Sequence, residues 1–96
     1  MPATIRLSES AVADLEAIRD WYGDQGVADV GDRLAADILQ RIERLRTHPD
    51  SGRVVPEFGQ AFLREIIFPP FRIVYRRDKN RIRVVRIWRS ERPLAI

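Results

Sequence analysis

The sequence predicts a two-layer α+β domain, in which two helices cover one face of an antiparallel β-sheet. Two patterns predict this class. In the first half, apolar residues recur at helical spacing over two consecutive segments. In the second half, three short runs rich in β-branched and aromatic residues follow one another through connections that are too short for a parallel crossover. The 96 residues are enough for one core, and we expect them to form a single domain, 1–96.

The first half is expected to hold one strand and two helices joined as an antiparallel hairpin. Thr4–Leu7 is an extended segment that can join the later sheet. Ser8 or Ser10 can cap the helix that follows. Gly23 and Gly26 are expected to end this helix. Its apolar stripe consists of Ala11, Leu15, Ile18 and Tyr22.

The second helix is expected over residues 27–47, where the His48-Pro49 dipeptide stops it. Gly31 is unfavourable inside a helix, and it is tolerated either because it lies in the first turn or because the two helices approach closely there. Its buried stripe consists of Val30, Leu34, Ile38, Ile42 and Leu45. Acid-to-base pairs at i,i+4 spacing are expected on its surface: Asp29–Arg33 and Asp37–Arg41.

The three runs in the second half are predicted to be strands at residues 62–68, 71–76 and 82–88. Pro69-Pro70 separates the first two strands, because neither proline can donate a ladder hydrogen bond. A polar turn at residues 78–80, with Asn80 at positive φ, separates the last two. The adjacent Val84 and Val85 point to opposite faces, and the pattern leaves open which of them faces the core.

Arginine interrupts the apolar residues of all three predicted strands. One face of the sheet is therefore expected to be dry and the other wet and cationic, and we expect function on the wet face. Residues 1–52 carry a net charge of −4 and residues 53–96 a net charge of +7. This division suggests an anionic partner, either nucleic acid or an acidic protein segment. Codon bias is the alternative explanation, because sixteen of the seventeen cations are arginine.

Several classes of protein and site are excluded or disfavoured by the composition. No apolar run approaches the ~18 residues of a membrane span, and the N-terminus has no apolar secretory segment. With no cysteine, these observations favour a cytoplasmic protein. One histidine cannot build a usual zinc site, and the sequence has no glycine-rich phosphate loop and no Ser-His-Asp set. We therefore expect neither a metal nor a cofactor.

The remaining candidates for chemistry are the arginines, Glu57 and Tyr75. Arginines on a sheet can bind a phosphate bidentately, and Glu57 can act as general base toward a ribose 2′-hydroxyl, as a metal-free ribonuclease requires. The structural alternative pairs Glu57 with Arg53 or Arg64 and gives Arg64 an ion pair within the sheet. On that alternative, Tyr75 and Trp88 are core or edge residues and not platforms for RNA bases.

The order of these motifs resembles the RelE/ParE superfamily, the toxins of type II toxin–antitoxin modules. The resemblance covers nearly the whole chain, through SESAVADLEAIRDWY, RLAADILQRIERLRTHPDSGRVVPEF, LREI, FRIVYR and VVRIWRSERPL. Its most specific parts are an L-x-x-x-P-x-x-G-R motif, the Arg64-Glu65 pair and the strand from Arg72 to Tyr75. The motif consists of Leu45, Pro49, Gly52 and Arg53. The resemblance implies a β-α-α-β-β-β fold.

The superfamily has two activities. RelE-like and YoeB-like members cut messenger RNA in the ribosomal A site, whereas ParE-like members poison DNA gyrase. YoeB-like ribonucleases use a glutamate after the second helix and an arginine on the second meander strand, positions that Glu57 and Arg72 match. Their histidine at the end of the last strand is replaced here by Arg89, and arginine is a poor general acid because it stays protonated. The lysines of RelE-type loops are also absent.

The resemblance therefore implies a growth-inhibiting toxin that a cognate antitoxin neutralises, with DNA gyrase favoured as the target. One alternative is a ribosome-dependent mRNA endoribonuclease, so enzymatic activity stays open. Another is a degenerate co-repressor that only binds its antitoxin. The catalytic candidates are Glu57, Arg64, Arg72, Tyr75 and Arg89. The antitoxin should place acidic and apolar residues on the cationic sheet. The candidates for binding the target or the antitoxin are Arg53, Arg76, Arg83, Arg86, Trp88 and Arg92.

Overall fold

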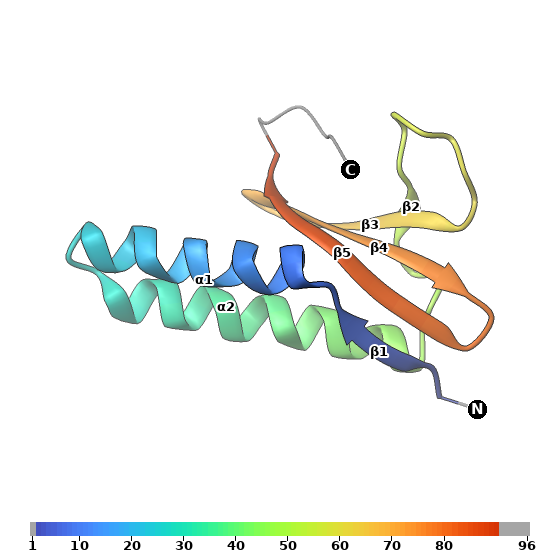
Figure 1. The fold of residues 1–96 in the computed structure, drawn as a ribbon, viewed down its shortest axis with the longest axis horizontal. Helices are drawn as coiled ribbons and strands as arrows, with labels where there is room; N and C mark the ends of the chain where they lie inside the picture. Colours follow the sequence, from blue (N-terminus) through green and yellow to red (C-terminus); the bar gives the residue numbers. More distant parts are fainter. Residues whose placement is uncertain (1, 91–96) are drawn as a thin grey trace.

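A five-stranded sheet in the order β1-β5-β4-β3-β2 carries two helices on one face, as Figure 1 shows. The computed structural model describes residues 2–90. Its elements are β1 Thr4–Leu7, α1 Glu9–Asp24, α2 Ala28–Glu43, a 3₁₀ turn Arg44–Arg46, β2 Arg53–Val54, β3 Leu63–Phe68, β4 Phe71–Asp78 and β5 Arg81–Arg89. The predicted α+β class and the order of elements are confirmed.

The sheet combines the predicted meander with two further strands at its edges. Strands β3, β4 and β5 pair antiparallel, as their short connections require. At one edge, β1 pairs parallel with β5, and the Thr4 amide donates to Asn80 O at 2.8 Å. At the other edge, β2 is a two-residue strand that pairs antiparallel with β3. The N-terminal segment therefore joins the last strand of the meander.

The helical hairpin begins at a capped residue and extends beyond the sheet (Figure 1). Ser8 is the N-cap of α1, because its Oγ accepts a hydrogen bond from the Ala11 amide at 3.0 Å. Helix α1 continues through Gly23, and the turn falls at Gly26, which has φ 79°. Trp21, near the end of α1, is 53% exposed. The far end of the hairpin is therefore only partly covered by the rest of the protein.

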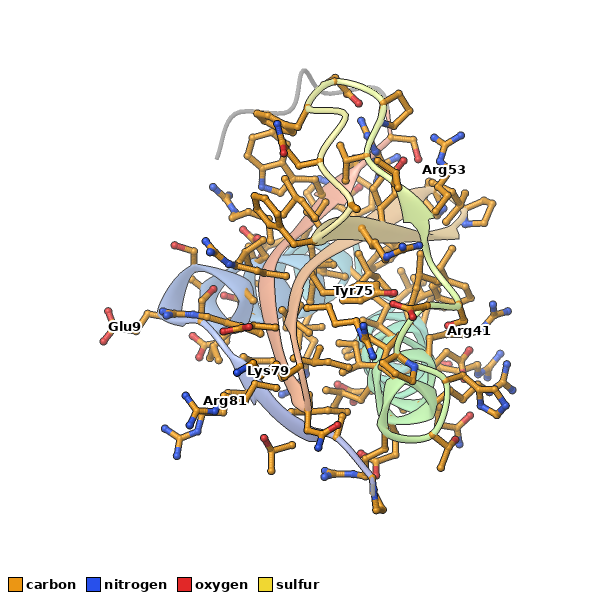
Figure 2. All side chains as sticks on the ribbon, turned by 90° about the vertical axis from the view of Figure 1, so that its right-hand side faces the viewer. Glu9, Arg41, Arg53, Tyr75, Lys79 and Arg81 are labelled. Carbon is orange, nitrogen blue, oxygen red and sulfur yellow. The ribbon has the colours of Figure 1, made fainter. Side chains whose placement is uncertain are left out.

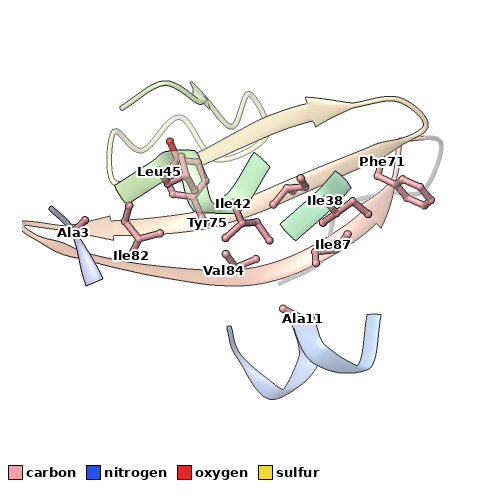
Figure 3. Close-up of a cluster of buried hydrophobic side chains, with 11 residues drawn as sticks. Ala3, Ala11, Ile38, Ile42, Leu45, Phe71, Tyr75, Ile82, Val84 and Ile87 are labelled. Atoms are coloured by element: carbon pink, nitrogen blue, oxygen red, sulfur yellow. The ribbon is translucent and has the colours of Figure 1, made fainter. Parts of the chain in front are cut away.

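The hydrophobic core lies between the helices and one sheet face (Figure 3). The predicted helical stripes are confirmed where the helices cross the sheet, because Ala11, Ile38 and Ile42 are buried. From the sheet come the buried side chains of Phe71, Ile73, Tyr75, Ile82, Val84 and Ile87. Farther along the hairpin, Leu15, Ile18 and Leu34 are only partly buried.

A β-bulge between β4 and β5 decides the faces that the sequence left open. Tyr75 pairs with Val84, whereas Val74 pairs with Arg86, so Val85 is the extra residue. Val84 therefore faces the core. The β4–β5 turn differs from the prediction, because Lys79 has the positive φ, at 53°, and not Asn80.

Among the ion pairs of residues 2–90, the predicted surface pairs Asp29–Arg33 and Asp37–Arg41 are absent. Instead, Arg19 Nε donates to Asp32 Oδ1 at 3.0 Å and joins α1 to α2. The prediction failed because exposed i,i+4 pairs gain only a few tenths of a kcal/mol, which other contacts easily outweigh.

Gly31 lies where the two helices approach closely, which is one of the two explanations that the sequence offered for a glycine in this helix. A Cβ at Gly31 would lie 2.9 Å from Tyr22 Cβ and 3.3 Å from Arg19 Cα. We expect Gly31→Ala to destabilise the fold by about 1–2 kcal/mol in urea unfolding, because overpacking outweighs the gain in helix propensity. Gly23→Ala is the matched control: nothing lies within 4 Å of its Cβ, and it should stabilise the fold by ~0.4–1 kcal/mol. A stabilising Gly31→Ala would contradict the close approach.

Candidate functional site

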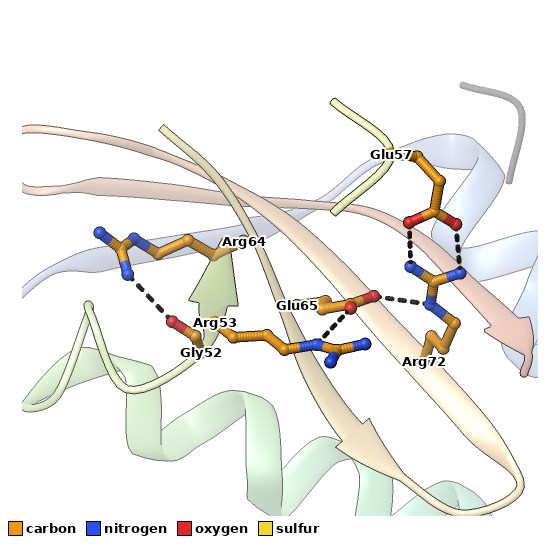
Figure 4. Close-up of polar contacts among 6 residues, drawn as sticks. All are labelled: Gly52, Arg53, Glu57, Arg64, Glu65 and Arg72. Atoms are coloured by element: carbon orange, nitrogen blue, oxygen red, sulfur yellow. Dashed lines mark hydrogen bonds and ion pairs between the residues drawn. The ribbon is translucent and has the colours of Figure 1, made fainter. Parts of the chain in front are cut away.

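Three of the sequence-predicted site residues, Arg53, Glu57 and Arg72, form an ion-pair network with Glu65 on the sheet face opposite the helices (Figure 4). Strands β2, β3 and β4 supply Arg53, Glu65 and Arg72, and the loop between β2 and β3 supplies Glu57. Glu65 accepts from Arg53 Nε at 2.7 Å and from Arg72 Nε at 2.6 Å. The two terminal nitrogens of Arg72 donate to the two carboxylate oxygens of Glu57, at 2.7 and 2.9 Å. Arg64 lies beside the network and donates to Gly52 O at 3.0 Å.

The centre of this network is buried. Glu65 is 1% exposed and Arg72 is 8% exposed. Val55 and Val74 are fully buried but lie outside the main core cluster. This part of the sheet is therefore covered, and the expectation of a wet sheet face is wrong around Arg72. A buried carboxylate is tolerated only when it is paired and hydrogen-bonded, which the network achieves for Glu65.

The electrostatics of the network fix the charge of Glu57. Its hydrogen bonds to Arg72 lower the pKa of Glu57 to about 2, and a backbone hydrogen bond of Glu57 acts in the same direction. Glu57 and then Glu65 raise the pKa of Arg72. A carboxylate with so low a pKa is a weak proton acceptor, and every guanidinium nitrogen of Arg72 already donates to a carboxylate. The arrangement holds the loop on the sheet and leaves little capacity for proton transfer.

The shifted pKa of Glu57 predicts how stability depends on pH. Because the folded-state pKa is about 2, below the usual 4.5, the Glu57–Arg72 pair stabilises the fold above about pH 4.5. This contribution is lost as the pH falls from about 4.5 toward 2. We expect the difference in unfolding free energy between wild type and Glu57→Gln to shrink over that window in urea titrations. The Glu57 side chain is 42% exposed, so solvent screening reduces the effect.

Glu16→Gln is the matched control for this measurement, because Glu16 is an exposed carboxylate on α1 with no ion pair among residues 2–90. A difference between wild type and Glu57→Gln that does not change below pH 4.5 would show that the pair does not form in solution.

Tyr75 and Arg64 hold the turn that precedes β2. Tyr75 is fully buried, its hydroxyl donates to Pro49 O at 2.8 Å, and it accepts from the Gly52 amide at 3.0 Å. Burial raises the pKa of this hydroxyl. Arg64 forms an ion pair with Asp50 at 3.6 Å in addition to its bond to Gly52. Tyr75 is thus a core residue, as the structural alternative expected.

The remaining arginines of the sheet divide into paired and unpaired groups. Arg86 donates to both carboxylate oxygens of Asp14 at 2.8 and 2.9 Å, and these hydrogen bonds raise the pKa of Arg86. The guanidinium of Arg86 also lies 4.5 Å from the centre of the Trp88 ring. Arg89 stacks on the Phe71 ring at 5.8 Å. The other two predicted sheet residues, Arg76 and Arg83, are exposed and have no ion pair among the described residues. Arg92 lies outside the described residues.

An apolar groove of about 480 Å³ lies between α1 and β5. It is lined by Ile18, Trp21, Tyr22, Phe71 and Trp88, with the Asp14–Arg86 pair among its polar residues. Sequence reasoning missed Trp21, because it lies off the apolar stripe of α1. The available signal was its position beside Tyr22: a large apolar side chain outside a helix stripe marks exposed surface.

Among residues 2–90, no group of three or more His, Cys, Asp or Glu side chains is placed to hold a metal ion. No helix in that range is both long and apolar enough to cross a membrane.

Comparisons with known proteins bear on this geometry. The family model described as "ParE toxin of type II toxin-antitoxin system, parDE" matches residues 5–94. No curated protein matches the chain. A solved chain of the chromosomal ParDE toxin–antitoxin system of P. aeruginosa is similar, with 24% identity, a TM-score of 0.78 and coverage of 93% of this chain and 97% of that one. A chain of the RelBE2 toxin–antitoxin complex of Mycobacterium tuberculosis is similar with 17% identity, a TM-score of 0.69 and coverage of 93% and 99%. At these identities the two structures establish a shared fold.

Proposed function

Because the chain belongs to the family of ParE toxins of type II toxin–antitoxin systems, we propose that it arrests growth by poisoning DNA gyrase and that a cognate antitoxin neutralises it. The alternative target within the same fold is messenger RNA on the ribosome, which requires an endoribonuclease. The two targets make different demands on the network around Glu57, because only the second needs groups that transfer protons.

The observation that carries the choice of gyrase is the bidentate pair between Glu57 and Arg72. A ribonuclease would use Glu57 as a base and Arg72 on the phosphate, yet here each neutralises the other. Tyr75 is buried with its hydroxyl bonded to Pro49 and Gly52. Arg89 stays protonated and is a poor substitute for an acid. The candidate catalytic residues therefore favour a structural role, which supports a toxin that acts by binding.

The gyrase proposal is tested with purified toxin, gyrase, ATP and a supercoiled plasmid. We expect linear plasmid DNA to accumulate after denaturation of the enzyme, and addition of the antitoxin encoded by the neighbouring small reading frame to abolish it. Primer extension on mRNA in a translation extract should show no toxin-dependent stops. Codon-specific cuts in mRNA without gyrase-linked DNA breaks would overturn the proposal in favour of the ribonuclease. An absence of both activities, with tight antitoxin binding, would indicate the co-repressor.

We propose further that the antitoxin occupies the groove between α1 and β5. The groove offers an exposed indole, that of Trp21, and aromatic side chains of this kind dominate binding energy when a partner buries them. The charged pair of Asp14 and Arg86 lines the same groove and can direct a polar group of the partner. Both structural neighbours come from toxin–antitoxin systems, which supports a protein partner for this fold.

Trp21→Ala should weaken antitoxin binding by about 2 kcal/mol, roughly thirtyfold in Kd, with little change in the melting temperature, because a hot-spot side chain is lost from an exposed position. Val12→Ala is the matched control, since Val12 is also on α1, is 42% exposed, and does not line the groove. Isothermal titration calorimetry with the antitoxin measures both variants. Equal affinities for the two would place the antitoxin elsewhere.

A further inference from the structure

Three arginines form a row across three neighbouring strands on the sheet face opposite the helices. Arg6 of β1 is the direct partner of Arg83 of β5, and Arg83 is the direct partner of Arg76 of β4. Directly opposite residues point to the same face, and neighbouring strands lie about 4.8 Å apart. All three side chains are exposed. The row therefore presents three adjacent guanidinium groups to solvent.

The row has no ion-paired carboxylate within the part of the chain that the structure describes. The three arginines line a hollow of about 1080 Å³. Glu9 and Asp78 also line this hollow, but neither forms an ion pair with the row among the described residues. Like charges placed directly opposite one another on a sheet destabilise it. The fold therefore carries a local electrostatic cost at this place.

An excess of arginine in the sequence does not by itself explain this electrostatic cost, because arginines elsewhere on the sheet are paired with carboxylates. At the β2 side, Arg53 and Arg72 are neutralised by Glu65 and Glu57. The row lies toward the opposite edge, beside Arg81, which also lines the hollow. In Figure 2, Arg81 and Lys79 lie at the end of the β4–β5 hairpin, away from Arg53. The cationic face that the sequence predicted is thus confined to the β1–β5–β4 side.

We propose that the row of Arg6, Arg83 and Arg76 binds the phosphodiester backbone of a nucleic acid. Two strand spacings separate the outer arginines by about 10 Å, and a nucleic-acid strand carries one phosphate charge for about every 3.4 Å of helix axis, so a strand laid along the row brings more than one phosphate within reach of it. Each guanidinium can bind a phosphate oxygen pair with two parallel N–H bonds. A polyanion removes the repulsion within the row by neutralising it.

The hollow fits a phosphate chain better than an acidic protein segment. Its apolar lining residues Ile5, Leu7 and Ile82 pack into the core or against it, so they offer no pocket for a side chain. Protein interfaces depend on buried apolar or aromatic anchors, whereas nucleic-acid affinity comes chiefly from phosphate contacts. The Phe62 ring, 4.9 Å from the Arg76 guanidinium, supports the cation from one side. This inference goes beyond the proposed gyrase poisoning and does not require gyrase.

The test measures binding of the toxin to a fluorescent 20-base-pair DNA duplex and to a 20-nucleotide single-stranded RNA. Each affinity is measured between about 50 and 200 mM salt, because affinity that comes from phosphate contacts falls as the salt concentration rises. The variant is Arg6→Gln with Arg83→Gln. The matched control is Arg33→Gln with Arg44→Gln, two exposed arginines of α2 and the turn after it that form no ion pair among the described residues and remove the same charge.

We expect the row variant to lose at least about tenfold in affinity and to flatten the slope of log K against log salt on duplex DNA by about 2, because two phosphate contacts are lost. The control variant should keep most of the wild-type affinity and most of the wild-type salt slope. The melting temperature of the row variant should be unchanged or higher, since two like charges are removed. Duplex and RNA arms distinguish the source of the phosphates.

Three outcomes would overturn the proposal: equal losses in the row variant and the control, no measurable binding of either nucleic acid, or row-dependent binding of poly-glutamate in place of both. None of these measurements contains gyrase. Failure of the row and failure of the gyrase proposal are therefore seen separately.

Discussion

Arg72→Ala is expected to destabilise the protein by about 3–5 kcal/mol, a large part of the 5–15 kcal/mol that typically stabilises a small domain. The substitution removes a partner of Glu65, which is 1% exposed, and both hydrogen bonds to Glu57. A buried carboxylate that loses an opposing charge keeps its desolvation cost without the compensating attraction. Urea unfolding at neutral pH measures the loss directly.

Arg83→Ala is the matched control for this prediction. Arg83 lies on the same sheet face but is exposed and has no ion pair among residues 2–90, so its removal should change stability by less than about 0.5 kcal/mol. Equal stabilities of the two variants would mean that Arg72 is available for a ligand. The comparison matters for function, because loss of toxicity in an unfolded Arg72 variant carries no information about catalysis.

Gly52→Ala should cost about 3 kcal/mol or more, because the site has no room for a methyl group. A Cβ at Gly52 would lie 2.7 Å from Tyr75 Cε1, 2.8 Å from its hydroxyl oxygen and 2.7 Å from the backbone oxygen of Glu65. Relief requires moving either a fully buried ring or strand β3. Moving the ring breaks the hydrogen bond between the Gly52 amide and the Tyr75 hydroxyl, and moving β3 disturbs its pairing with β2 and β4. Thermal unfolding should therefore report a clear drop in melting temperature.

Two further variants separate a steric effect from a general effect of altering this turn. Ser51→Ala, at an exposed neighbouring position, should stay within ~0.5 kcal/mol of wild type. Adding Tyr75→Phe to Gly52→Ala removes the contact with the hydroxyl but keeps those with the ring carbon Cε1 and with Glu65 O. Because it also removes the hydrogen bonds of the hydroxyl, the double variant should be no more stable than Gly52→Ala. A Gly52→Ala protein as stable as wild type would show that β2 and β3 can separate without cost.

The sequence predicted the class and order of elements because these depend on local patterns. Residues at helical spacing in α1 and α2 and β-branched runs in β3, β4 and β5 are sufficient to assign them. The bulge at Val85 could not be predicted, because it depends on the register between β4 and β5. The same holds for the parallel pairing of Thr4–Leu7 with β5, for which the sequence suggested membership of the sheet but no direction.

The candidate site was predicted less completely, because ion pairs depend on contacts between distant segments. The sequence identified Glu57 and Arg72 individually, and the structural alternative for Glu57 named Arg53 or Arg64 as its partner. The actual partner is Arg72, which becomes a neighbour only when the β2–β3 loop folds over the sheet. Likewise, Glu65 and Arg72 share a face only once the register of β3 and β4 is known. Composition reveals an excess of arginine but not which of them are neutralised.

The pairing of β1 with β5 has a consequence for the order of events during synthesis. Thr4 bonds to the carbonyl of Asn80, 76 residues later in the chain. Such a contact is made only after the intervening chain closes a long loop. Arg6 leaves the ribosome early, whereas Arg83 is added near the completion of β5. While the polypeptide is still growing, the two halves of the arginine row are therefore apart, and an incomplete translation product carries no assembled row.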